Sequence, residues 1–141
     1  MVEGLDVGVG YYDQETDSTV TTGNYGQDEG TAYIKYSTGP VSVGYERGVV
    51  STQAATAETS YDNRMIGISY KISDDLSVSY NELESRKSSR GTDVDQEFDS
   101  ISVSYSMGGM TINLADSDVS NSAYNVGRGV DATSVSLAIA F

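Results

Sequence analysis

Large apolar residues alternate with small or polar residues along this chain, and the last nine residues show the pattern most clearly. Val135, Leu137, Ile139 and Phe141 occupy alternate positions, and serine or alanine occupies the positions between them. Successive side chains of a β-strand point to opposite faces, so this stretch predicts a strand with one apolar face and one small, partly polar face. We interpret it as a terminal strand whose apolar face meets lipid.

The same alternation recurs in seven earlier stretches. No window keeps the i, i+3, i+4, i+7 apolar spacing of an amphipathic helix for long, so the chain is predicted to be all-β. Besides residues 133–141, the predicted strands cover residues 5–12, 31–36, 41–46, 66–72, 76–81, 101–107 and 110–115.

The connections between these stretches fall into two classes. Three are tight turns rich in glycine, proline, serine and aspartate, at residues 37–40, 73–75 and 107–110. The other four are polar and without periodicity, and we expect long loops there, at residues 13–30, 47–61, 82–99 and 116–129. Short turns at one end and long loops at the other predict an antiparallel up-and-down meander.

Composition narrows the possible functions. The 141 residues suit a single domain, residues 1–141, and contain neither cysteine nor histidine, which excludes thiol nucleophiles, Cys/His zinc sites and histidine-based triads. The formal net charge of −13 argues against a nucleic-acid partner. We therefore expect neither an enzyme nor a cofactor. An outer-membrane enzyme that uses a pair of carboxylates is the least favoured alternative.

Three features favour a transmembrane β-barrel over a soluble β-sandwich, which is the other reading of such alternation. The non-apolar face is mostly serine, glycine, alanine and asparagine. All the predicted short turns lie at one end of the strands and all the long loops at the other, and tyrosine supplies 11 of the 13 aromatic residues. No apolar run approaches the roughly 18 residues of a membrane-spanning helix. Aromatic residues near the ends of apolar faces suit the two membrane interfaces, and the candidates are Tyr11, Tyr36, Tyr70, Tyr105 and Phe141.

Four segments together give the chain a resemblance to a known family. Residues 2–11, 31–45, 102–112 and 137–141 resemble the C-terminal half of a Gram-negative outer-membrane porin of the alphaproteobacterial type. The resemblance implies a 16-stranded, trimeric diffusion channel for small hydrophilic solutes and ions in the cell outer membrane, with a terminal phenylalanine that the assembly machinery reads. The start of the chain has no secretory signal, and eight strands are half of sixteen, so we expect the domain to be incomplete at its N-terminus.

Two barrel architectures compete at this point. A closed eight-stranded barrel would serve as an anchor or adhesion protein that acts through its extracellular loops. Its interior is just wide enough to be filled by side chains, and the serine, glycine and alanine residues of this chain would fill it poorly. A wide aqueous pore makes no such demand, so half of a 16-stranded barrel is favoured. The partners are then outer-membrane lipid, the diffusing solutes and ions, and other copies of the chain.

Two groups of charged residues are candidate sites. Asp6, Lys35, Glu46 and Lys71 share the parity of the small residues and are expected to face the lumen, where they would tune ion preference or simply be solvated at the rim. Four alternating carboxylates in the predicted loop 82–99 offer oxygen ligands for calcium. That stretch lacks the glycine and terminal glutamate of a helix-loop calcium motif, so a solvated acidic loop is favoured over a metal site for Asp93, Asp95, Glu97 and Asp99.

Overall fold

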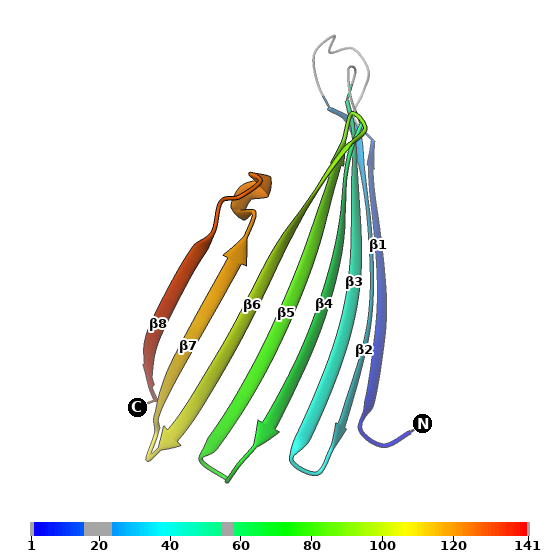
Figure 1. The fold of residues 1–141 in the computed structure, drawn as a ribbon. Helices are drawn as coiled ribbons and strands as arrows, with labels where there is room; N and C mark the ends of the chain where they lie inside the picture. Colours follow the sequence, from blue (N-terminus) through cyan, green and yellow to red (C-terminus); the bar gives the residue numbers. More distant parts are fainter. Residues whose placement is uncertain (1, 16–23, 55–57, 141) are drawn as a thin grey trace.

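The protein forms one antiparallel β-sheet of eight strands (Figure 1). The computed structural model describes residues 2–15, 24–54 and 58–140. One short 3-10 helix, η1 (Ser122–Tyr124), lies between the last two strands. The strands are β1 (Leu5–Glu15), β2 (Asn24–Thr38), β3 (Val41–Ala54), β4 (Thr59–Lys71), β5 (Leu76–Ser89), β6 (Thr92–Met107), β7 (Met110–Ser120) and β8 (Val130–Ile139).

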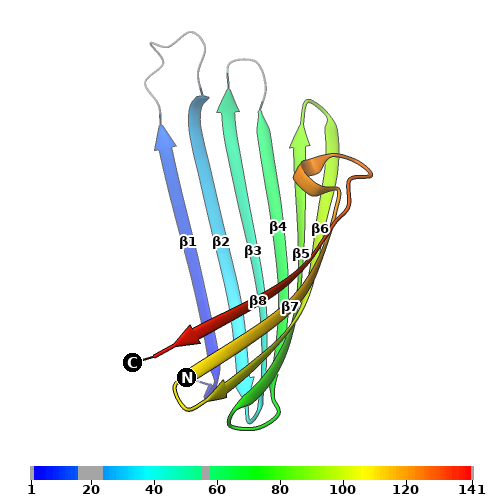
Figure 2. The same ribbon diagram turned by 90° about the vertical axis from the view of Figure 1, so that its left-hand side faces the viewer.

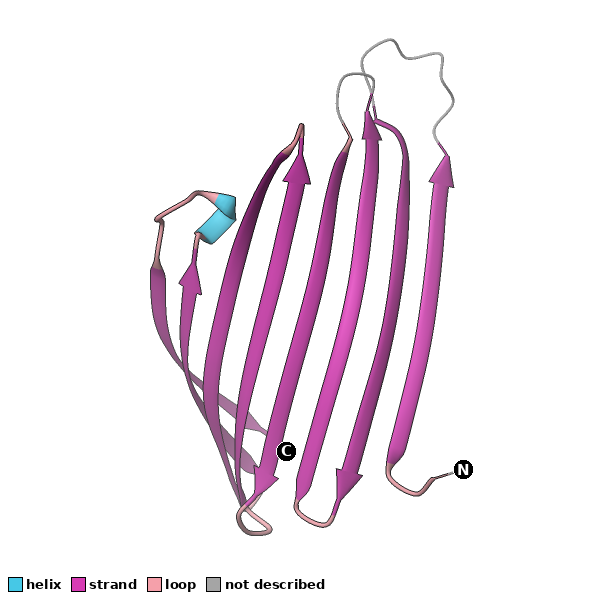
Figure 3. Ribbon diagram, turned by 45° about the vertical axis from the view of Figure 1, so that its right-hand side comes forward, coloured by secondary structure: helices cyan, strands magenta, loops and turns pink. Residues whose placement is uncertain are grey.

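Each strand pairs with its sequence neighbour, so the predicted up-and-down meander is confirmed. The sheet curves as a single layer, and β1 and β8 are its two edges (Figures 1 and 3). Figure 2 shows β7 and β8 crossing in front of the other strands at a steep angle, on the open side of the curve. No strand pairing joins β8 to β1 in the described residues, so the sheet is open.

The described residues form a single layer without a hydrophobic core. None of the hydrophobic side chains in the described parts of the chain is buried, and the solvent-accessible area is 9756 Å². A compact monomer of 15.0 kDa would expose about 7,000 Å². A soluble β-sandwich needs a second sheet packed on the first, and the described residues form only one. The sandwich alternative is therefore excluded for them.

The three short turns occur where they are predicted, at one end of the sheet. Residues 39–40, 72–75 and 108–109 connect β2 to β3, β4 to β5 and β6 to β7. Gly39 and Gly108 have φ values of +54° and +55°, and Gly109 has φ +84°. Glycine adopts such a backbone without the steric cost that a β-carbon brings.

The predicted long loops are largely wrong, because the strands continue into them. The clearest case is residues 82–99, where β5 and β6 extend until only Arg90 and Gly91 form the turn, with φ values of 52° and 74°. Two consecutive residues of positive φ are typical of a tight hairpin. The alternation in this stretch is one of charged and polar residues, and the register pairs Arg86 with Asp95 across the hairpin.

Among the described residues, no helix is both long enough and apolar enough to cross a membrane.

Candidate functional site

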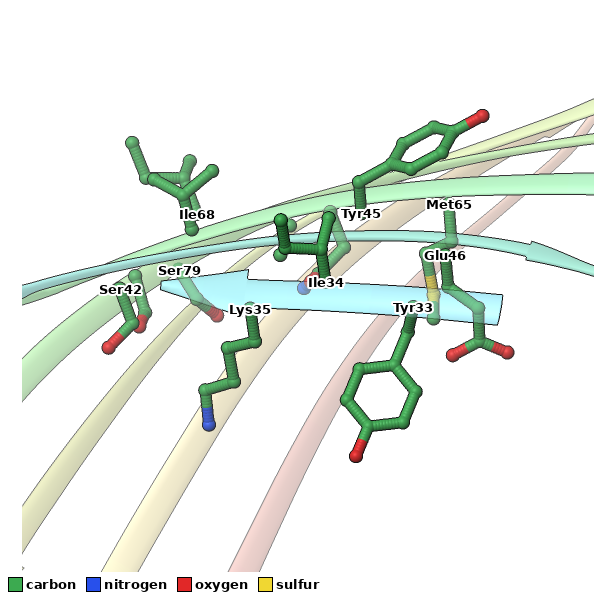
Figure 4. A pocket seen from close by; sticks show the side chains of 14 residues that line it. Tyr33, Ile34, Lys35, Ser42, Tyr45, Glu46, Met65, Ile68 and Ser79 are labelled. Carbon is green, nitrogen blue, oxygen red and sulfur yellow. The ribbon is translucent and has the colours of Figure 1, made fainter. Parts of the chain in front are cut away.

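The sheet has two chemically different faces. Figure 4 shows Ile34, Tyr45 and Ile68 on one side of the sheet, which we call the convex face. The opposite side, toward which β6, β7 and β8 curve, is the concave face. It carries Tyr33, Lys35, Ser42, Glu46 and Ser79.

The convex face carries a continuous band of exposed apolar side chains, as the alternation predicts. The band lies on the half of the sheet nearest the short turns and crosses all eight strands. Ile68, near its middle, is 46% exposed. Other exposed members of this apolar band are Val7, Val9, Ile34, Val43, Ile66, Ile101, Val103, Ile112, Leu114, Val135, Leu137 and Ile139.

A charged residue follows the apolar band on every strand. Moving away from the short turns, the first charged side chain of the same parity follows one to three convex positions beyond the preceding large apolar residue, and only on β3 does another large apolar residue, Val49, lie beyond it in the described part of the chain. In strand order these residues are Asp13, Asp28, Arg47, Arg64, Glu82, Asp99, Asp116 and Asp131. The band therefore has a polar border on every strand, which is staggered in the register, since Asp28 lies opposite Ser51 and Arg64 opposite Glu84.

Tyrosines lie along both margins of the apolar band. Tyr36, Tyr70 and Tyr105 lie near the short turns, on the convex face and 44–47% exposed, and Tyr11 lies at the charged border. Their placement on the apolar face is as predicted, whereas Phe141 lies outside the described residues. The prediction omitted two convex tyrosines that each precede a charged border residue by two positions, Tyr45 and Tyr80. That two-residue spacing is the signal that would have identified them.

Beyond the border, ion pairs cross the convex face from β3 to β6. Arg47 forms two hydrogen bonds to Asp62, at 3.1 and 2.8 Å. Arg86 binds Asp95 in the same two-point manner, at 2.6 and 2.9 Å. The hydrogen bond from each arginine lowers the pKa of its carboxyl partner. Arg64 lies 3.9 Å from Glu84.

The structure corrects the predicted acidic loop, for which solvation was favoured over calcium binding. Asp93, Asp95, Glu97 and Asp99 lie on β6 rather than in a loop, and they point to the convex face at alternate positions. Asp95 is engaged by Arg86, and Asp99 accepts a hydrogen bond from Tyr80 at 2.5 Å. In the described residues, no three acidic side chains are grouped so as to hold a metal ion.

Farther along the border, three acidic side chains on β6, β7 and β8 lie opposite other acidic residues rather than opposite arginine or lysine. The register places Asp99, Asp118 and Asp131 side by side on adjacent strands. A hydrogen bond with Asp131 and the surrounding negative charge raise the pKa of the Asp118 carboxyl, which lies beyond the apolar band. This end of the border is therefore strongly acidic.

The half of the concave face nearest the short turns is lined by small and hydroxyl-bearing residues. Serine pairs face each other across neighbouring strands and share hydrogen bonds, so their hydroxyl groups form rows perpendicular to the strands. The pairs are Ser37 with Ser42 at 2.8 Å, Ser79 with Ser102 at 2.7 Å and Ser100 with Ser117 at 2.9 Å. This face is polar without carrying many charges.

All four predicted lumen charges lie on the concave face. The register sets Asp6 opposite Lys35, and Asp6 accepts a hydrogen bond from Tyr33 at 3.3 Å. Thr31 donates to Glu46 at 3.3 Å. Lys71 instead pairs with Asp74 of the adjacent turn at 2.9 Å, so it belongs to the short-turn rim. The structure thus brings Asp6, Lys35 and Glu46 onto neighbouring strands and separates Lys71 from them.

The predictions missed an apolar row on the concave face. Each member of the row lies directly opposite the next member on the neighbouring strand, so the row runs perpendicular to the strands. The row lies at about the level where the convex face becomes charged. These residues lie in or beside stretches that were interpreted as loops, so they were assigned to no face. They are Met65, Leu83, Phe98, Val119 and Val130.

Comparison with known proteins gives no relative for this chain. No protein-family model, no curated protein and no solved structure matches it.

Proposed function

We propose that this chain is part of the wall of a water-filled channel in the outer membrane of a Gram-negative bacterium, through which small hydrophilic solutes and ions diffuse passively. One observation carries the proposal: an exposed apolar band crosses all eight strands on the convex face and is followed by a charged residue on each of them. Behind it lies a concave face rich in hydroxyl groups.

Lipid is the environment that this apolar band suits. Soluble monomers seldom expose a contiguous apolar patch larger than a few hundred Å², and here most large hydrophobic residues are exposed. Tyrosine rings prefer the membrane interface, because one end of the ring is apolar and the hydroxyl is polar. Tyr36, Tyr70 and Tyr105 lie along one margin of the band, and Tyr11, Tyr45 and Tyr80 lie along the other.

The open edges support a wide barrel completed by further strands. Unpaired backbone groups are costly in hydrocarbon, so a sheet in lipid must close. β1 and β8 have 11 and 10 residues and run in opposite directions, so further antiparallel strands, from an upstream half or a second copy, can continue the sheet at both edges. In this proposal the complete barrel has 16 strands and forms trimers, as the resemblance implies.

The electrostatics of the chain suit diffusion rather than turnover. The proposed channel needs neither cofactor nor catalytic group, and solutes cross along the hydroxyl rows of the concave face. The net charge of −13 draws cations toward the mouth, where the border beyond β6 is most acidic. Salt screens this bias, so it weakens as ionic strength rises.

Conductance in planar lipid bilayers tests the proposal. The folded protein, together with whatever strands close its edges, is expected to give ohmic conductance steps. A bulky residue on the concave face, Ser79→Trp, should reduce the conductance per step, whereas Val78→Leu on the neighbouring convex position should not. Folded, membrane-inserted protein without channels would contradict the proposal and would favour an anchor that acts through its loops.

A further inference from the structure

The segment between β7 and β8, residues Asn121–Gly129, lies against the concave face (Figure 2). We call it the docked loop. The Asn121 amide donates a hydrogen bond to the Asp95 carbonyl at 2.8 Å, and the Ala123 N–H donates to the Gln96 side chain at 2.8 Å. Both partners belong to β6, which runs beside β7. The loop is therefore fastened across the sheet rather than projecting away from it.

The backbone of the docked loop is shaped for this position. Asn121, Ala123 and Tyr124 have φ values of 51°, 56° and 57°, a region that residues with a side chain seldom adopt. The Asn121 side chain also accepts a hydrogen bond from the Gly127 N–H at 2.9 Å, which ties the two halves of the loop together. Three such residues so close together need compensating contacts, and Tyr124 supplies some of them through its contacts with the sheet.

Tyr124 reaches across β6 to residues of β4 and β5. Its hydroxyl lies 2.7 Å from the hydroxyl of Ser85, which is only 4% exposed. Its ring lies 5.5 Å from the ring of Tyr61, measured between centroids, at an interplanar angle of 55°. Lys87 places its ammonium 5.5 Å from the centre of the Tyr124 ring and 5.9 Å from that of Tyr61. A cation within about 6 Å of a ring centre is attracted by the ring face.

Lys87 is a cation held in an acidic chain. In the part of the chain that the structure describes, it takes part in none of the ion pairs, which join Arg47, Arg64, Lys71 and Arg86 to carboxylates. The two rings fix its position without neutralising its charge. Its ammonium therefore remains available to ions that pass the concave face.

We propose that the docked loop narrows the lumen over β4 to β6 and that, through Tyr124, it positions Lys87 as a residue that sets ion selectivity. This inference rests on the proposed channel function. Lys87 supplies the charge, and Tyr124 is a positioning residue that acts on ions through Lys87. The positive charge disfavours cations at this depth and so opposes the acidic border.

Selectivity measured in a KCl gradient tests the role of Lys87. A unit charge within about 6 Å of a hydrated ion changes the local ion concentration by roughly threefold at the dielectric constant of water. Because the charge acts on the two ions in opposite directions, Lys87→Gln is expected to raise the K⁺/Cl⁻ permeability ratio by up to the square of that factor, roughly tenfold, with little change in conductance. Lys87→Arg should keep the original ratio. An unchanged ratio in Lys87→Gln channels would overturn the proposal.

The role of Tyr124 is tested by conductance together with selectivity. Tyr124→Ala should release the loop, raise the conductance per step and move the permeability ratio in the same direction as Lys87→Gln. The matched control is Tyr12→Ala, because Tyr12 lies in the same register row on the concave face but far from the loop. Equal effects of the two alanine variants would contradict the proposal.

Cross-linking separates a failure of this inference from a failure of the channel proposal. The chain contains no cysteine, so Gln96→Cys combined with Ala123→Cys introduces a single reactive pair. A short bismaleimide should join these two residues in the folded protein, and Tyr124→Ala should reduce the yield. The control pair combines Ala123→Cys with Gln14→Cys on β1. Cross-linking without conductance would reject the channel, whereas conductance without cross-linking would reject the docked loop.

Discussion

The assignment of lipid and water to the two faces predicts opposite results at adjacent residues. Ile68 and Ser69 are neighbours on β4, but Ile68 belongs to the convex apolar band and Ser69 to the concave face. Arginine at position 68 would place a charge in the middle of the band. Arginine at position 69 would place the same charge among hydroxyl groups.

The expected magnitudes differ enough to be measured. Ile68 lies between Val43 and Tyr80 in register and is 46% exposed, so in water Ile68→Arg should change the free energy of unfolding by only about 0.5 kcal/mol. At the midplane of a bilayer, arginine costs about 2–4 kcal/mol. That penalty corresponds to a roughly 30- to 700-fold change in the folding equilibrium. Ser69→Arg should remain near zero in either case.

The assay is folding of the protein, together with whatever strands close its edges, into lipid vesicles, with urea titration of each variant followed by circular dichroism or by gel mobility. The convex variant should shift the midpoint strongly toward low urea, and the concave variant should fold like the unmodified chain. Equal costs at positions 68 and 69 in lipid would refute the assignment of the convex face to the membrane.

Three further predictions concern the part of the sheet beyond the apolar band. The hydrogen bond from Arg86 lowers the pKa of the Asp95 carboxyl. The stability that the ionised Asp95 contributes is therefore complete above about pH 4 and is lost as the pH falls through its native pKa. Asp95→Asn should remove this component of acid unfolding. The pKa of Asp118 is raised by Asp131, so the native state should gain stability as pH falls from 7 through that pKa, and Asp118→Asn should flatten the profile. Because Gly91 has φ +74°, Gly91→Ala should lower the free energy of unfolding by about 1 kcal/mol. The urea midpoint should fall while the slope of the transition stays unchanged. An increase in stability would contradict the turn geometry.

Apolar alternation predicted the strands and faces well and the loops poorly. The apolar half of β5, from Leu76 to Tyr80, was assigned correctly, whereas its polar half, from Glu82 onward, was interpreted as loop. Both halves alternate with the same period, but the second alternates among charged and polar residues. Cross-strand pairs such as Arg86 with Asp95 hold that half in the sheet, and such pairing becomes visible only when the register is known.

The order of residues by itself determined the number of strands, their antiparallel order and which side chains share a face. Those properties follow from a side-chain period of two and from short turns, and both are local. Only the tertiary structure decided which residues of different strands form rows, because a register aligns positions that are distant in the chain. It paired Arg86 with Asp95 across neighbouring strands and set Tyr124 beside Tyr61 and Lys87, two residues of other strands that no local pattern connects with it.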